Sequence, residues 1–364
     1  MEFVNKTSFP AGWTGAFAPD GREQLVVVVK GTFVIPRDGE AVEVALEQVP
    51  LVQADEFTGE PGMSAVRYET DYAHRKPMCD VLLNGSAYAP GGKPTTQVGV
   101  GMRVGQAAKA FNVVGSRVWR RALGVSPASP QPFDVMPVSY DNAFGGTDMS
   151  AGDPGNVATF LPNPVGQGYA HHAEHAAGRP LPNTEERNAP VVSPTGRYRP
   201  MAFGSIGRQW PPRVEYVGTY DDKWQQERRP FWPDDFDDRY FQSAPPDQQI
   251  PYPTGDEDVV LQNLTADGHV GFKLPVLPMP VWVVPAKGRV ERTDAVIDTV
   301  FIEPDLGRFT LTWRAVIPMA QSWFDAEEIV VGEVSEAWRR LKTYGDKPYY
   351  RGLAELVRAR GRRV

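Results

Sequence analysis

The segment His171–His175 (HHAEH) has the residue types and spacing that come closest to metal chemistry. It fits the H-x-x-E-H pattern, in which two histidines one helical turn apart bind Zn²⁺ and a glutamate acts as general base. Such a site needs a stable helix and a further ligand, yet Gly166, Gly178 and Pro180 bracket the segment and leave barely two turns. We therefore interpret it as an exposed polar loop or short helix, and we predict no metal or other cofactor. A zinc hydrolase remains an alternative.

Four aspartates surround Phe236, and a pair of carboxylates is the other constellation that could do chemistry. They are Asp234, Asp235, Asp237 and Asp238. Two carboxyl groups that face each other across a cleft can hydrolyse a glycosidic bond. Ca²⁺ would need a wrapped set of oxygens with EF-hand spacing, which this segment lacks. A solvated acidic turn is the interpretation we favour, and a carbohydrate- or peptide-processing hydrolase is the alternative.

Aromatic side chains gather in the second half of residues 150–255, a stretch that Gly, Pro, Asn and Asp interrupt every few residues. The stretch shows no sustained period and is far longer than an ordinary loop. Its aromatic residues pack either on the core or against a partner, and Trp and Tyr dominate the energetics of protein interfaces. The residues that we predict as a partner-binding surface are Trp210, Tyr220, Trp224, Phe231, Trp232, Phe236 and Tyr240.

Strands must position these segments. Gln24–Ile35 is rich in β-branched residues and stops at Pro36, and Ala41–Val49 alternates apolar and acidic residues, so the two predict a hairpin. Asp305-Leu306-Gly307 predicts a second tight turn. Further strands are predicted at Asp80–Tyr88, Gln97–Val104, Lys109–Trp119, Val270–Pro275, Val281–Val284, Ala295–Glu303 and Arg308–Pro318.

The C-terminal part has a different pattern. Asp325–Leu341 begins with acidic residues and ends near Arg339-Arg340, the charge order that a helix dipole favours. Ile329, Val330, Val334, Trp338 and Leu341 fall near one face at helical spacing. We predict a helix over Asp325–Leu341 that packs on the β core, and a second short helix over Leu353–Arg360.

The composition narrows the classes of function. The 35 prolines cannot lie inside helices or central strands and so indicate many turns. The net charge of −7 argues against a nucleic-acid partner. A single cysteine, Cys79, excludes an intramolecular disulfide and suits a reducing compartment. The first residues lack the pattern of a signal peptide, and the chain lacks an apolar run of the length that crosses a bilayer, so we predict a cytoplasmic protein without membrane contact.

An ordered series of short phrases resembles one bacterial family, the domain of unknown function 2169. The phrases are KGTF (residues 30–33), DV followed by NGSA (80–87), SYDNAFGG (139–146), NPVGQG (163–168), LPNTE (181–185), GTYDDKW (218–224), PDDF (233–236) and APPDQ (244–248). The resemblance implies that the protein is encoded beside type VI secretion spike, PAAR-repeat and effector proteins. It also implies an adaptor or chaperone that helps to load an effector onto the spike. It supplies no catalytic residues.

Together these observations predict a mainly β fold, with an antiparallel sandwich-like core over residues 1–320. Residues 150–255 form a long irregular excursion within it, and residues 321–364 form a helical segment that packs on it. We predict a binding protein and not an enzyme, whose partners are a type VI effector, a PAAR-containing spike protein, or both.

Overall fold

The apolar run near the N-terminus forms the longest strand of a seven-stranded sheet. The strand order is β19-β7-β24-β25-β3-β2, and β4 pairs with the far end of β3. All neighbours are antiparallel except β7 and β24, which are parallel. The strands are β2 (Ala11–Phe17), β3 (Glu23–Val34), β4 (Glu43–Val44), β7 (Cys79–Leu83), β19 (Gln249–Ile250), β24 (Val296–Glu303) and β25 (Arg308–Pro318).

Two further sheets cover one face of this sheet. The five-stranded sheet has the order β18-β10-β9-β20-β21, and the four-stranded sheet has the order β1-β26-β22-β23. Their bounds are β9 (Gln97–Val104), β10 (Ala107–Val114), β18 (Thr184–Glu185), β20 (Asp258–Gln262) and β21 (His269–Lys273), then β1 (Glu2–Asn5), β22 (Pro280–Pro285), β23 (Glu291–Asp294) and β26 (Ala326–Val331). All three sheets contribute to one hydrophobic core, with Leu311, Phe111 and Ile329 as examples.

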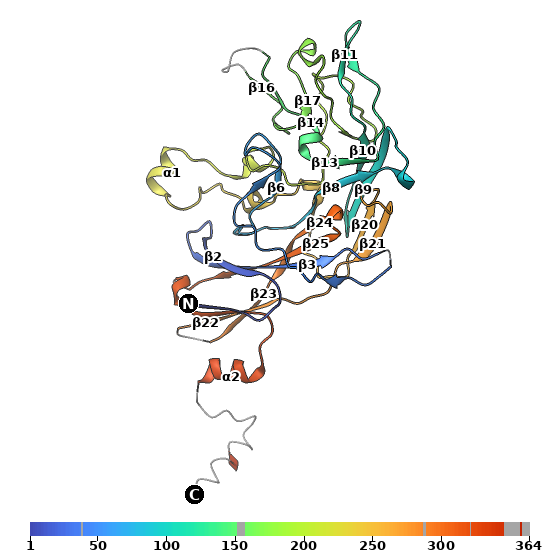
Figure 1. Cartoon of the computed structure of the whole chain (residues 1–364). Coiled ribbons are helices and arrows are strands. Elements are labelled where there is room, and N and C mark those ends of the chain that lie inside the picture. The colour runs from blue at the N-terminus through green and yellow to red at the C-terminus, as the bar shows by residue number, and fades with distance from the viewer. Residues whose placement is uncertain (38, 151–156, 287–288, 321, 346–356, 359–364) are drawn as a thin grey trace.

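The computed structural model describes residues 1–37, 39–150, 157–286, 289–320, 322–345 and 357–358. Within them the protein is mainly β, as predicted, with α-helices α1 (Asp222–Glu227) and α2 (Glu336–Tyr344) (Figure 1). Short pairs complete the strands: β5 (Glu56–Phe57) with β6 (Val66–Tyr68), β8 (Gly85–Tyr88) with β13 (Val135–Val138), β11 (Trp119–Arg121) with β12 (Val125–Pro127), β14 (Phe144–Gly145) with β17 (Gln167–Gly168), and β15 (Thr147–Asp148) with β16 (Ala158–Thr159).

The predicted hairpin after β3 forms, but only two residues of its second strand pair. Ala45 N–H still donates to Thr32 C=O. Beyond that point the side chain of Gln48 takes the place of a strand, because its amide donates to Thr32 C=O and accepts from Thr32 N–H at 2.8 Å. The chain therefore leaves the sheet after Gln48. Residues 49–71 then pass over the face of the sheet that is opposite the main core, and we call them the strap.

The helix predicted over Asp325–Leu341 is wrong in its first part. Ala326–Val331 is strand β26, which lies between β1 on one side and β22 on the other. The run Ile329-Val330-Val331 is β-branched and fully buried, which suits an interior strand better than a helix. The helical part begins only after the Ser335 N-cap. Residues 326–331 of the predicted helical segment therefore belong to a sheet that contains the first strand of the chain. The helix predicted at Leu353–Arg360 lies almost wholly outside the described residues.

The excursion over residues 150–255 is anchored on the seven-stranded sheet by strand β19, which pairs with β7, and by a buried carboxylate. Asp80 on β7 is completely buried. It accepts hydrogen bonds from the backbone N–H groups of Ser243 and Ala244, at 2.8 and 3.1 Å, and from the side-chain amide of Gln242 at 2.6 Å. Lys76 balances the charge at 2.8 Å. The excursion is thus packed against the sheet by a buried polar anchor.

Candidate functional site: a polar cavity and an aromatic ridge

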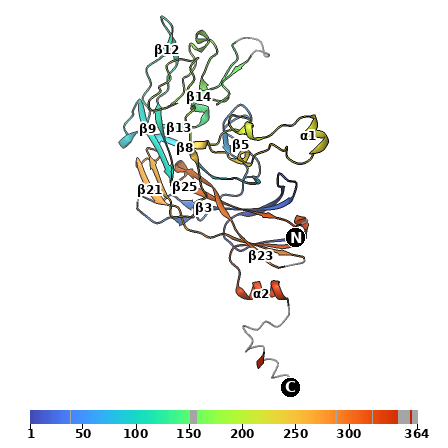
Figure 2. The same cartoon turned by 180° about the vertical axis from the view of Figure 1, so that it is seen from behind.

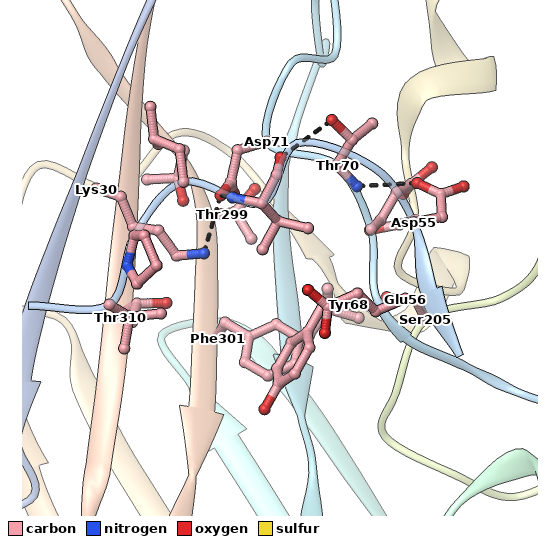
Figure 3. A pocket seen from close by; sticks show the side chains of 18 of the residues that line it. Lys30, Asp55, Glu56, Tyr68, Thr70, Asp71, Ser205, Thr299, Phe301 and Thr310 are labelled. Carbon is pink, nitrogen blue, oxygen red and sulfur yellow. Dashed lines mark hydrogen bonds and ion pairs between the residues drawn. The ribbon is translucent and has the colours of Figure 1, made fainter. Parts of the chain in front are cut away.

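A cavity of about 500 Å³ lies between the strap and the outer face of the seven-stranded sheet. Strand β25 shows why that face is polar. Phe309, Leu311 and Trp313 enter the main core, and the alternate residues Thr310 and Thr312 line the cavity, since side chains of a strand alternate between faces. The neighbouring strands add Lys30 from β3 and Thr299, Phe301 and Glu303 from β24. Figure 3 shows the side chains of Lys30, Thr299, Phe301 and Thr310 beneath the strap.

The buried charges that line the cavity lie in ion pairs. The Lys30 ammonium lies 2.9 Å from the Asp71 carboxylate, and both side chains are almost fully buried. The same carboxylate accepts from Val52 N–H at 2.8 Å and so holds the strap over the sheet. Lys76, at the end of the cavity, pairs with Asp80. Burial alone would lower the pKa of Lys76, but the carboxylates of Asp80, Asp298 and Glu69 outweigh it and raise that pKa.

One wall of the cavity is aromatic. The rings of Tyr68 and Phe301 lie with centroids 5.5 Å apart (Figure 3). The Tyr68 hydroxyl donates to Glu303, whose other oxygen accepts from Arg308 at 2.7 Å. Burial, together with the hydrogen bond to the Glu303 carboxylate, raises the pKa of Tyr68. The phenol therefore stays protonated at neutral pH, and this wall carries no uncompensated charge.

A second feature lies at the outer edge of the same sheet. Ala18 N–H donates to Arg22 C=O and Lys30 N–H donates to Pro10 C=O, so the even-numbered residues of β2 bond to β3. The N–H groups of Trp13, Gly15 and Phe17 consequently point outward. Within the described chain they have no hydrogen-bond partner. Strand β2 is an open edge, the kind of edge to which an extended peptide can add.

A row of half-buried and exposed aromatic rings runs beside this edge, and we call it the aromatic ridge. Successive members are in contact: Tyr220 with Trp224 (centroids 4.6 Å apart), Phe231 with Phe17 (5.2 Å), Phe17 with Trp323 (5.3 Å) and Trp323 with Phe324 (6.0 Å). Trp224 Nε1–H donates to Phe231 C=O at 2.9 Å and joins the first pair to the rest. Phe324 is 80 % exposed and Tyr220 48 % exposed.

Helix α1 positions the outer end of the ridge. Asp221 caps it by accepting from Trp224 N–H at 2.8 Å. Arg228, just after the helix, donates to Pro19 C=O at 2.6 Å in the turn between β2 and β3. These contacts place α1 near β2, on the same side of the molecule in both views (Figures 1 and 2). An element of the excursion thus lies next to the open edge.

The structure divides the predicted partner-binding residues into three groups. Tyr220, Trp224 and Phe231 belong to the aromatic ridge. Trp210 and Phe236 are buried, at 7 % and 8 % exposure, and so are not available on the surface of the chain. Trp232 and Tyr240 are half-buried and pack around Phe236 and Phe241. The remaining ridge members, Phe17, Trp323 and Phe324, escaped sequence analysis because each lies in a segment distant from the excursion.

The HHAEH segment contains one turn of 3₁₀ helix, Ala173–Ala176. The ring of His172 contacts those of His171 and His175, with centroids 4.5 and 5.3 Å away. His175 Nδ1 lies 3.4 Å from Asp148, which is already engaged by Arg179 at 3.2 Å. Over the part of the chain that the structure describes, no group of three or more His, Cys, Asp or Glu side chains is arranged to hold a metal ion.

The four aspartates each have a separate partner. Asp234 pairs with Arg228, Asp235 accepts from Thr219, Asp237 pairs with Arg239, and Asp238 lies 3.7 Å from Arg75. A backbone hydrogen bond from Thr219 lowers the pKa of Asp235, and a side-chain hydrogen bond from Arg239 lowers that of Asp237, whereas burial raises the pKa of Asp238. This is the arrangement of an acidic turn in which each carboxylate has its own local contacts.

The comparisons with known proteins place the chain in a family. In the described residues, no helix has the length and apolar character needed to span a membrane. No curated protein and no solved structure is significantly similar to this chain. A family model described as an uncharacterized protein conserved in bacteria (DUF2169) matches residues 20–314. This range includes the cavity and half of the aromatic ridge, namely Tyr220, Trp224 and Phe231, and the chain therefore belongs to the DUF2169 family.

Proposed function

We propose that this protein is an adaptor or chaperone that holds a segment of another protein along strand β2 and the aromatic ridge, without a chemical step. The observation that carries the proposal is the open edge of β2 beside the half-buried rings of Phe17 and Phe231 and the exposed ring of Phe324. Strand addition gains main-chain hydrogen bonds, and burial of aromatic rings supplies most of the binding energy at an interface. Neither requires a catalytic group.

The client is a type VI secretion effector or its PAAR-containing spike partner, and the complex forms in the cytoplasm before loading. This part of the proposal comes from the role that the DUF2169 resemblance implies. A segment awaiting transport must be kept from aggregating, and a strand held on an edge has its own backbone groups covered. A chaperone of this kind protects its client through the same contacts by which it binds.

Deletion and co-expression with the effector and spike genes encoded beside this protein test the role. We expect the effector to become insoluble or unstable, and to be no longer secreted, when this protein is deleted. An effector that stays soluble, stable and secreted in the deletion strain would exclude the chaperone role.

Surface variants test the site. The double variant Tyr220→Ser and Phe324→Ser removes two accessible rings, and it should weaken co-purification of the client by at least about tenfold. Leu123→Ser is a matched control, since Leu123 is fully exposed in the turn between β11 and β12, away from α1 in both views (Figures 1 and 2). Equal client binding by wild type and the double variant would show that the client does not bind at the aromatic ridge.

A further inference from the structure

Three hydroxyl groups in the cavity beneath the strap have no hydrogen-bond partner in the described part of the chain. Thr310, Thr312 and Ser205 line the cavity and are 3 %, 2 % and 1 % exposed. Ser205 Oγ is a buried atom without a hydrogen-bond partner among the residues that the structure describes. The hydroxyls of Thr310 and Thr312 line the cavity and make no hydrogen bond to another described residue. Buried polar groups are nearly always hydrogen-bonded, because an unsatisfied hydroxyl loses its contacts with water. One buried hydroxyl without a partner, beside two hydroxyls on the cavity wall, indicates that a molecule in the cavity completes these hydrogen bonds.

The cavity has the size and lining of a small-molecule site. Its volume of about 500 Å³ falls within the range of about 300–1,000 Å³ that is typical of such sites. Gln53, Ala54 and Glu56 of the strap line it and are exposed, so they mark its mouth. The Tyr68 and Phe301 rings form an apolar wall within it. A ligand here meets an aromatic surface on one side and hydroxyl groups on another.

The pairing of the buried charges favours a neutral ligand over an ionic one. Lys30 and Asp71 neutralise each other, and Glu303 is held by Tyr68 and Arg308. An ionic ligand would have to separate one of these buried pairs, and breaking such a pair is costly. A neutral ligand can form hydrogen bonds with the donors and acceptors of these residues that the ion pairs do not use. The Lys30 ammonium has N–H donors beyond the one directed at Asp71, and Asp71 Oδ1 accepts no hydrogen bond from the described chain.

We propose that this cavity binds a neutral, polyhydroxylated ligand, a saccharide of one or two units. The C–H face of a sugar ring suits the aromatic wall of Tyr68 and Phe301. Its hydroxyl groups both donate and accept, as Thr310, Thr312, Ser205 and the Lys30–Asp71 pair require. The proposal is independent of the adaptor role, since the cavity lies beneath the strap and shares no residue with the aromatic ridge.

Isothermal titration calorimetry with the full chain tests the proposal. The probes are glucose, maltose, N-acetylglucosamine and N,N′-diacetylchitobiose, with arginine and citrate as a cationic and an anionic comparison. At least one sugar should bind saturably and more tightly than either ion. The double variant Thr310→Val and Thr312→Val should weaken that sugar at least about tenfold, because two hydrogen bonds are lost.

The valine variant separates binding from folding. Valine has the shape of threonine and suits a strand, and the lost hydroxyls have no protein partner, so thermal unfolding should be unchanged or occur at a higher temperature. Thr293→Val on β23, outside the cavity, is the matched control and should bind as wild type does. Binding of no sugar in the panel, preference for arginine or citrate, or equal sugar binding by wild type and the double variant would each overturn the proposal.

Discussion

Phe231 of the excursion packs edge-on against Phe17 of strand β2, with ring centroids 5.2 Å apart and an angle of 82° between the rings. The contact joins the irregular central stretch to the edge of the largest sheet. On its other side Phe17 contacts Trp323, which follows β25. Three distant parts of the chain thus supply one accessible aromatic surface beside an unpaired strand edge. The first prediction concerns that edge.

Hydrogen exchange should report client binding on alternate residues of β2. The amide protons of Trp13, Gly15 and Phe17 point outward and should exchange rapidly in the free protein. If a client strand adds to this edge, their exchange should slow by at least about tenfold, since each then donates a hydrogen bond. Thr14 and Ala16 already bond to β3 and should change little. Uniform protection of all five amides would contradict strand addition. The outer strand β23 serves as a control that should not change.

Loss of the Asp80 carboxylate should destabilise the fold strongly. Asp80→Asn leaves the Lys76 ammonium buried without its counter-ion, and removing one partner of a buried ion pair costs about 3–5 kcal/mol of unfolding free energy. Urea unfolding measures the change. Asp256→Asn removes the exposed pair with Lys273 and should change the free energy by less than about 1 kcal/mol. Similar effects of both substitutions would refute the anchoring role of Asp80.

Stability should rise with pH above 8 because of Lys109. This ammonium is 6 % exposed and donates to Gln248 at 2.7 Å, and burial lowers its pKa to about 8. The ordinary value is 10.5, so the unfolded chain binds more protons than the folded protein between about pH 8 and 10.5. Folding stability therefore increases with pH across that window.

Between pH 8 and 9.5 the gain attributable to Lys109 should reach up to about 2 kcal/mol. Urea unfolding at several pH values measures it. Tyr88 has its pKa raised to about 12 by burial and by Asp305, so its opposing effect begins only above about pH 10. Burial raises the pKa of Cys79 well above its ordinary value of 9.0, so the thiol opposes the gain already from about pH 9. Lys109→Met should flatten the profile below that point. A parallel rise in the variant would show that another group is responsible.

Helix α2 should depend on one tryptophan. The helix has no buried residues, and it is held by Trp338 against Trp282, with centroids 6.3 Å apart, and by the pair of Lys342 with Glu328. A helix of this length is marginal by itself. Trp338→Ala should therefore abolish exchange protection over residues 336–344, yet change global stability by less than about 1 kcal/mol. Leu341→Ala, at a position 54 % exposed, should leave the protection intact. Retained protection in Trp338→Ala would mean that other contacts hold the helix.

Local pattern was enough to predict most of the strands. Gln24–Ile35, Gln97–Val104 and Arg308–Pro318 correspond closely to β3, β9 and β25, because β-branched and alternating residues favour an extended chain whatever its neighbours. Pattern failed at Ala326–Val331, where acidic residues followed by an apolar run resemble the start of a helix. Pairing with β1 and β22 decides in favour of a strand there, and those partners lie far away in the sequence.

The sequence by itself determined the class of fold, the family and the presence of an aromatic-rich excursion, since each depends on residues close together in the chain. Only the tertiary structure decided which aromatic residues are accessible, because burial depends on distant segments: Trp210 packs against Tyr140, whereas Phe231 reaches Phe17. The alternation of Thr310 and Thr312 with core residues was visible in the sequence. That the strap encloses them beside Lys30 and Asp71 followed only from the folded chain.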